Sequence, residues 1–332
     1  MSERKAGRSH AAQNARSARR LLVLAGWIAG IAILLHGFGA LSASEPPDTP
    51  ASAAPASGNA SMLGTMTVEE RKKLERQVNR YVSTVVVRYI NDSLVRWDVP
   101  ICPLVAGLPH KRGEFILWRI TQIAAAVGAP MAGEHCKVNF FVVVTPQPDE
   151  LLKLWLRRDP HMYDTTMGMP HIKSFMRSPR PIRCWYNTEF RSSDGRALAS
   201  DAFAAGVPGM GMQMMPVQAP TSTSSSASRL GFTAVQTLSS VIIVVDMKRA
   251  QELTLGQLSD YIALVGLAEI HLDGDVGSAP TILRLFQTST SRPEGLSEWD
   301  QAFLHALYNT SQSSVMQASS IKQSMVKRIV LQ

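Results

Sequence analysis

Aromatic residues and charged residues are both scarce in this sequence. Of 332 residues, 7% are aromatic and 18% are charged, and no stripe of Lys and Arg is interleaved with aromatic side chains. Nucleic-acid-binding surfaces combine those features, so the sequence argues against a nucleic-acid partner. The formal net charge of +8 does not change this interpretation, because most of it lies in one short segment at the start of the chain.

Motifs of common hydrolases and nucleotide-binding proteins are also missing. The chain contains no Gly-x-Ser-x-Gly, and the glycine-rich piece 206–211 lacks both the third glycine and the Lys-Ser/Thr pair of a phosphate-binding loop. The acidic piece 273–275 lacks the later ligands of a twelve-residue calcium loop, so a turn explains it better. No repeat with a period of 20 to 50 residues is present. We therefore predict no cofactor.

Cysteine is the third scarce residue type, with only Cys102, Cys136 and Cys184. In an oxidising compartment three cysteines allow one disulfide and leave one thiol. Cys102 and Cys136 flank one expected helix, and we predict that they form the disulfide. A zinc site would need further ligands such as His110 and His135, whose spacing matches no known zinc knuckle, so we predict no metal site.

What the chain does contain is a basic tail followed by a long apolar segment. Residues 1–20 carry six basic side chains against one acid, and residues 21–41 are uncharged for about the length that crosses a bilayer at roughly 1.5 Å per residue. The positive-inside rule places the tail in the cytoplasm and the rest of the chain across the membrane. We predict a single-pass inner-membrane anchor. A cleaved signal peptide ending near Leu41-Ser42-Ala43, giving a periplasmic or secreted protein, and a buried core helix are the alternatives.

The remainder divides into a tether, one domain and an insertion. Residues 42–66 are rich in Pro, Ala and Ser and are expected to be a flexible tether. Residues 67–332 are expected to form a single extracytoplasmic domain. Residues 191–228 are a low-complexity Gly, Met, Pro and Ser insertion within that domain.

Apolar periodicity and capping residues predict a mixed α+β fold, a mixed sheet with packed helices preceded by one N-terminal hydrophobic helix. The segments 81–90, 137–145, 182–190 and 237–246 are expected to be strands. The expected helices cover residues 67–80, 113–127, 149–158, 255–269, 297–308 and 315–330, with a short one near 281–286. Residues 97–109 and 159–181 are expected to be loops.

One part of the chain resembles a known group of proteins. The residues 240–308 run as a buried strand, a helix, the piece Thr281-Ile282-Leu283-Arg284-Leu285-Phe286, and then Leu296-Ser297-x-Trp299-Asp300-x-x-Phe303. This order, with the upstream piece Trp97-Asp98-x-Pro100-x-Cys102-Pro103, is similar to proteobacterial envelope proteins, some of them lipoprotein-like, whose C-terminal half is zincin-like. No cysteine follows the apolar segment, so a lipid anchor is not expected here.

The resemblance implies a degenerate protease site. A metzincin helix reads His-Glu-x-x-His-x-x-Gly-x-x-His, in which two histidines one turn apart bind zinc and the Glu polarises water. Alignment on Gly266 puts Ser259 and Ala263 at the two helix ligands, Asp260 at the catalytic Glu and Glu269 at the third ligand. Two of the three ligands are lost, so zinc protease chemistry is not expected.

Three hypotheses follow for function. The first is a non-catalytic binding or scaffolding domain with a candidate groove formed by Asp260, Glu269 and His271. The second is a hydrolase that uses Asp260 and Glu269 as acid and base. On a straight helix those two carboxylates would lie roughly 13 Å apart along the axis, which argues against a pair unless the helix ends near Gly266. The third is a component of an envelope assembly that contacts an envelope protein partner through residues 191–228.

Overall fold

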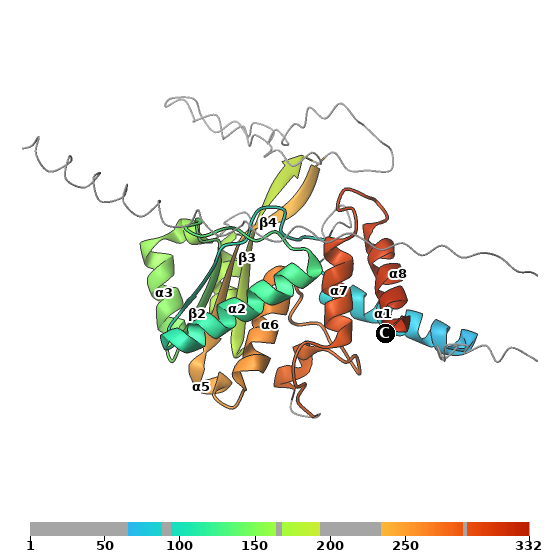
Figure 1. Cartoon of the computed structure of the whole chain (residues 1–332). Coiled ribbons are helices and arrows are strands. Elements are labelled where there is room, and N and C mark those ends of the chain that lie inside the picture. The colour runs from blue at the N-terminus through green and yellow to red at the C-terminus, as the bar shows by residue number, and fades with distance from the viewer. Residues whose placement is uncertain (1–65, 88–93, 164–167, 193–233, 288–290, 332) are drawn as a thin grey trace, which may run out of the picture. The chain divides into compact units, whose positions relative to one another are not determined.

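A computed structural model describes residues 66–87, 94–163, 168–192, 234–287 and 291–331 (Figure 1). The predicted tail, the apolar segment 21–41, the tether up to residue 65 and residues 193–228 of the insertion lie outside these residues. Within the described residues, no helix combines the length and the apolar character that crossing a bilayer requires. Residues Met62–Gln332 form one compact unit.

The sheet has four strands in the order β1-β2-β4-β3. Strands β1 (Pro103–Ala106), β2 (Phe140–Thr145) and β4 (Ala234–Asp246) are parallel, and β3 (Ile182–Ser192) pairs antiparallel with β4 at one edge. Residues 241–245 of β4 are buried on both faces of the sheet. This position explains their unbroken run of β-branched residues, since a central strand covered on both sides has no polar face.

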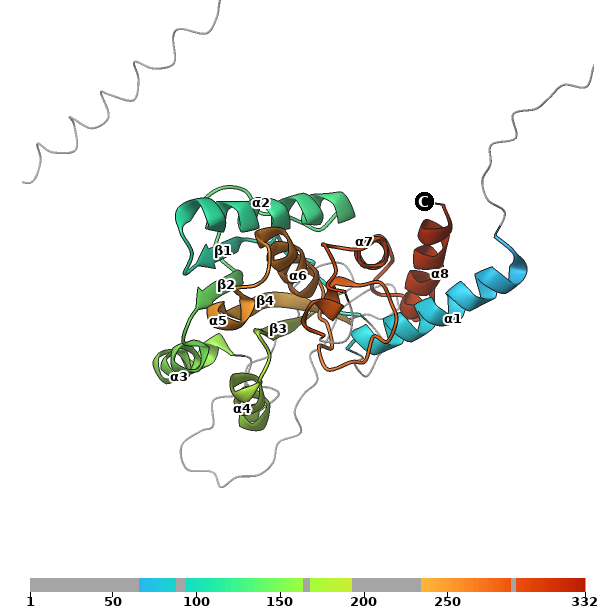
Figure 2. The same ribbon diagram turned by 90° about the horizontal axis from the view of Figure 1, so that it is seen from below.

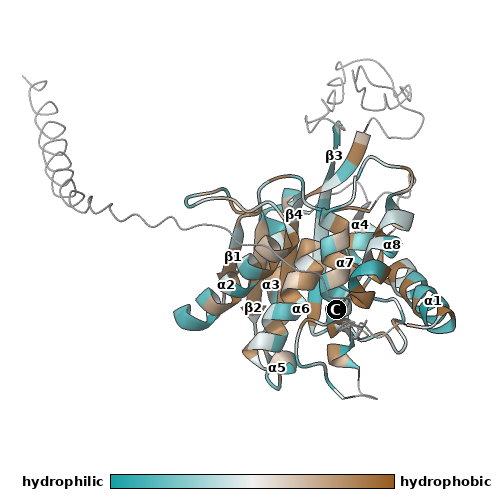
Figure 3. Ribbon diagram, turned by 45° about the vertical axis from the view of Figure 1, so that its right-hand side comes forward, coloured by the Kyte–Doolittle hydropathy of each residue, from teal (hydrophilic) through white to brown (hydrophobic). Residues whose placement is uncertain are grey.

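Helices cover both faces of this sheet (Figure 2). Helices α2 (His110–Val127) and α6 (Leu255–Leu267) pack on one face, and α3 (Pro148–Arg158) and α4 (Gly168–Arg177) lie on the other. Among these strands, β2 is coloured hydrophobic in Figure 3, whereas much of the edge strand β3 is coloured hydrophilic. Because side chains alternate across a strand, β4 supplies Ile243 to one core and Ile242 to the other.

A second group of helices extends the fold beyond the sheet. Helices α1 (Val68–Val85), α7 (Glu298–Tyr308) and α8 (Gln317–Val330) pack together and join the core that α2 and α6 share. The described residues also include the short helices η1 (Pro160–Met162), α5 (Met247–Ala250) and η3 (Ile282–Phe286). The chain is therefore α+β, with a mixed sheet, as the sequence predicts.

The strand predicted at 81–90 is wrong for its first half. Helix α1 continues to Val85, and its residues Val78, Tyr81, Val82 and Val85 are buried. Their spacing of three and four residues puts them on one helix face. The Tyr81 ring packs edge-on against Trp299 of α7. Burial of this face outweighs the modest β preference of the valines.

Two predicted loops contain regular structure. The segment 97–109 includes the edge strand β1, which begins at Pro103, where a proline removes no ladder hydrogen bond that an interior strand would need. The segment 159–181 includes η1 and α4. Helix α4 has Pro170 in its first turn and buries only Ile172 and Phe175, so its apolar pattern is too short to identify from sequence.

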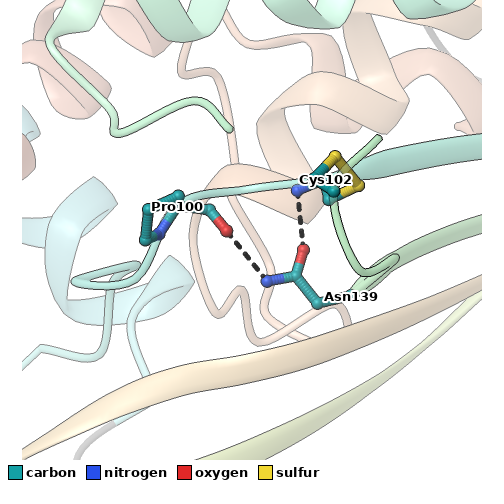
Figure 4. Close-up of a disulfide and its surroundings, with 4 residues drawn as sticks. Pro100, Cys102 and Asn139 are labelled. Carbon is teal, nitrogen blue, oxygen red and sulfur yellow. Dashed lines mark hydrogen bonds between the residues drawn. A yellow bond between two sulfur atoms is a disulfide. The ribbon is translucent and has the colours of Figure 1, made fainter. Parts of the chain in front are cut away.

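The structure joins Cys102 to Cys136 with an S–S distance of 1.99 Å across 34 residues (Figure 4). The bond links the start of β1 to the segment that leads into β2. Asn139 supports the same junction: its Oδ1 accepts from the Cys102 amide at 2.7 Å, and its Nδ2 donates to the Pro100 carbonyl at 3.0 Å. Cys184 is the free cysteine.

Candidate functional site

Helix α6 carries the residues that the sequence singles out, and it is the most buried helix of the fold. The Thr254 hydroxyl accepts from the Gln257 amide, and Oε1 of Gln257 accepts from the Thr254 amide, which forms a capping box. All residues from Leu258 to Leu267 are buried. The helix therefore lies between the sheet, α2 and α7 with no wide polar face.

Asp260 is held by an ion pair inside this packing. Its carboxylate is 4% exposed and accepts from both sides of the Arg119 guanidinium, at 2.5 Å from Nε to Oδ1 and 3.0 Å from Nη2 to Oδ2. The Leu296 amide donates to Oδ2 at 2.7 Å. Asp260 thus joins α2, α6 and the loop before α7.

Ser259, Ala263 and Gly266, the neighbouring positions of the metzincin alignment on α6, also have structural roles. The Ser259 hydroxyl donates to the Leu255 carbonyl at 2.6 Å, and Ala263 is fully buried. A Cβ on Gly266 would lie 2.0 Å from Cζ of Phe140, so this glycine permits the close approach of α6 to β2. The Gly266 carbonyl accepts from the Trp97 indole at 2.8 Å.

The three residues of the candidate groove have different surroundings. Asp260 faces Arg119 of α2, whereas Glu269 lies just past the end of α6 near Tyr186 of β3. The pKa of Tyr186 is raised chiefly by burial, and the Glu269 charge is a smaller cause in the same direction. His271 is exposed and lines a cavity of about 300 Å³ with Arg180, Tyr261 and Phe286 among the other residues. Of the three, the cavity contains His271 only.

Three weak acids of β3 and α6 have raised pKa values, and one of them, Tyr261, lines this cavity. Burial raises the pKa of Cys184 to about 12 and raises the pKa values of Tyr186 and Tyr261 well above the ordinary phenol value. The Tyr186 hydroxyl donates to the Val265 carbonyl at 2.8 Å. The raised pKa values favour the protonated forms at neutral pH, in which these groups can donate hydrogen bonds.

A second cavity lies at the other end of the sheet and was not predicted. It has a volume of about 640 Å³ beside the disulfide, and Asn139, His161, Asn187 and Ser240 are among its lining residues. Asn187 accepts from the Trp185 indole and donates to Ser240 and to the Met162 carbonyl. An asparagine inside a strand was the available signal, because Asn is depleted in strands unless its amide has a specific role.

In the part of the chain that the structure covers, no three side chains of the His, Cys, Asp and Glu types converge in a way that would hold a metal ion. Comparisons with protein-family models, with curated proteins and with solved structures found no match to this chain.

Proposed function

We propose that this chain is a single-pass envelope protein whose large extracytoplasmic part is a non-catalytic binding or scaffolding domain on a degenerate zincin-like fold. The proposed location and fold follow from the resemblance of residues 240–308 to envelope proteins. The binding region would be the cavity lined by His271, and its occupant an envelope protein or a small ligand of the envelope.

The observation that carries this proposal is that the polar side chains Ser259 and Asp260 of α6 are already hydrogen-bonded within the protein. In a zinc protease this helix presents ligands and a general base to an open site. Here the Asp260 carboxylate is closed off by Arg119 and the Leu296 amide, and the Ser259 hydroxyl bonds within the helix. A general base must reach the proton it removes, so Asp260 is better explained as a structural residue than as the acid or base of a hydrolase.

The zincin-like part of the proposal rests on the position of α6. This helix follows β4, a central strand of a mixed sheet, through the short helix α5, and packs against the sheet with Gly266 at the point of closest approach. Gly266 thus has a packing role that does not depend on a metal. Loss of the ligands at Ser259 and Ala263 would then leave the scaffold intact.

Metal content tests the degenerate site. The full-length protein would be purified from membranes in a neutral detergent and analysed by elemental mass spectrometry. We expect no stoichiometric zinc. About one zinc per chain, retained through dialysis as a structural or catalytic site retains it, would refute the proposal and direct attention to His110, His135, His161, His171 and His271.

Partner binding tests the cavity. Because His271 is exposed at the rim, His271→Trp should fill the cavity without disturbing the core. The matched control is His110→Trp, which alters an exposed histidine of α2. Proteins and small molecules that co-purify with the tagged full-length chain would be compared by quantitative mass spectrometry. A component lost from His271→Trp and kept by the control supports the proposal, and equal recovery from all three proteins argues against this cavity.

A further inference from the structure

Helix α1 presents a row of cations to a cavity that the proposed function does not use. The cavity has a volume of about 280 Å³ and lies between α1, the loop 276–280 and the start of α7. Lys73, Arg76 and Arg80 line it from α1. Their spacing of three and four residues puts them on one face of the helix. No Asp or Glu is among the residues that line this cavity.

This arrangement is not explained by stability of the helix. Arg76 and Arg80 are four residues apart, a spacing at which like charges repel. Neither takes part in an ion pair with any residue that the structure describes. In contrast, Arg71 on another face of the same helix pairs with Glu75 at 3.2 Å. The two arginines therefore cost some helix stability and leave two guanidinium groups directed to solvent at one cavity.

The opposite wall is formed by the loop 276–280 and by Trp299, which is 8% exposed. Ser278 is exposed at the same wall. Asp275 directly precedes this loop, accepts from the Gly277 amide at 2.8 Å and so shapes the loop itself. Glu298 and Asp300 flank Trp299 in sequence, and neither lines the cavity. Gly277 adopts a left-handed φ of 55° at this turn.

We propose that this cavity binds a phosphate group. The dianion of a phosphate monoester has only acceptor oxygens, and the cavity offers it the Arg76 and Arg80 guanidinium groups and the Lys73 ammonium. Arginine forks suit phosphate oxygens through paired hydrogen bonds. The volume, slightly below that of a drug-sized site, limits the ligand to a small phosphate monoester, either a soluble molecule or the headgroup of a phospholipid. This site goes beyond the proposed function, and it shares no lining residue with the cavity at His271.

The test is binding of two phosphate probes to the full-length protein in a neutral detergent. Inorganic phosphate and monomeric dihexanoyl phosphatidic acid would be titrated by calorimetry at constant ionic strength set with chloride. The variant Arg76→Gln/Arg80→Gln keeps good helix formers at exposed positions, and Arg157→Gln/Arg158→Gln on α3 removes the same charge elsewhere. Circular dichroism verifies that both fold.

We expect saturable binding to the wild type that is at least about 10-fold weaker in Arg76→Gln/Arg80→Gln, since charge-assisted hydrogen bonds are lost, and unchanged in the α3 control. Binding of inorganic phosphate identifies a soluble ligand, whereas the same variant dependence with the lipid probe alone identifies a headgroup. Absence of saturable binding of both probes, or equal weakening in the two variants, would overturn the phosphate site.

Discussion

Asp300 is the most heavily bonded side chain of the fold. It is fully buried, and its two oxygens accept from the Tyr81 and Thr281 hydroxyls, from the Ile282 amide, and from both the amide and the hydroxyl of Ser297. Burial raises the pKa of this carboxyl, and the hydrogen bonds act in the opposite direction. One side chain thus ties α1, η3 and α7 together.

This network predicts a large difference between two substitutions of Asp300. Asp300→Ala leaves five donors without an acceptor and should lower the free energy of unfolding by roughly 3–5 kcal/mol. Asp300→Asn should cost less, because its amide oxygen can keep the two backbone donors while the Tyr81 and Thr281 hydroxyls rotate to accept. Urea denaturation followed by tryptophan fluorescence measures both. Equal losses would show that charge, not hydrogen bonding, is what the site requires.

Gly266 gives a prediction about packing. The added methyl of Gly266→Ala would meet the ring of the fully buried Phe140, and overpacking of this kind costs about 1–3 kcal/mol or more. Phe140→Leu in the same chain should restore part of that loss, since the smaller side chain vacates the space. A double-mutant cycle of unfolding free energies tests the coupling, and strict additivity would contradict the contact.

At the scale of elements, Arg119 and Asp260 join α2 to α6 and to the loop before α7. Arg119→Ala leaves the nearly buried Asp260 carboxylate without its counter-charge and should destabilise by about 3 kcal/mol. Arg119→Leu/Asp260→Leu should be less harmful than Arg119→Ala, because it removes both charges at once. The comparison uses the same denaturation assay. A double variant that is worse than the single one would indicate that Asp260 has a role beyond this ion pair.

The disulfide should stabilise the junction between β1 and the segment that leads into β2. Cys102→Ala/Cys136→Ala opens a loop closed across 34 residues, which by chain entropy should cost about 3–4 kcal/mol. Non-reducing peptide mapping should recover the Cys102–Cys136 peptide pair. Cys184 should resist alkylation in the native state, because burial raises its pKa to about 12. A bridge that contains Cys184 would refute the pairing.

Elements with a long periodic pattern could be predicted from the sequence, and those with a short or contrary pattern could not. Helices α2, α6 and α7 have caps and apolar faces that sequence rules identify. The end of α1 could not be predicted, because its valines favour a strand until tertiary packing, mainly against α8, buries this helix face. The four residues of β1 could not be predicted either, since a short edge strand has too little pattern to read.

For the whole molecule, the limits of sequence reasoning lie in contacts between distant residues. The sequence identified Asp260, but Arg119 precedes it by 141 residues and nothing in the spacing links the two. The net charge likewise did not indicate the proposed phosphate site. The positive charges of α1 are offset in that sum by acidic residues elsewhere in the domain. Only the fold brings α1 beside the loop 276–280 and Trp299.

Segment 21–41 lies outside the described residues, so its role as a membrane anchor has to be tested by experiment on the whole chain. If it is an uncleaved anchor, the full-length protein should stay in the membrane fraction after alkaline carbonate washing, and a chain that starts at Met62 should be soluble, because Met62–Gln332 is a compact unit of its own. Protease added to intact spheroplasts should digest the domain and spare the N-terminal tail. A mature product whose N-terminus lies near Ala43 would instead establish cleavage, and protection of the domain from protease would show the opposite topology.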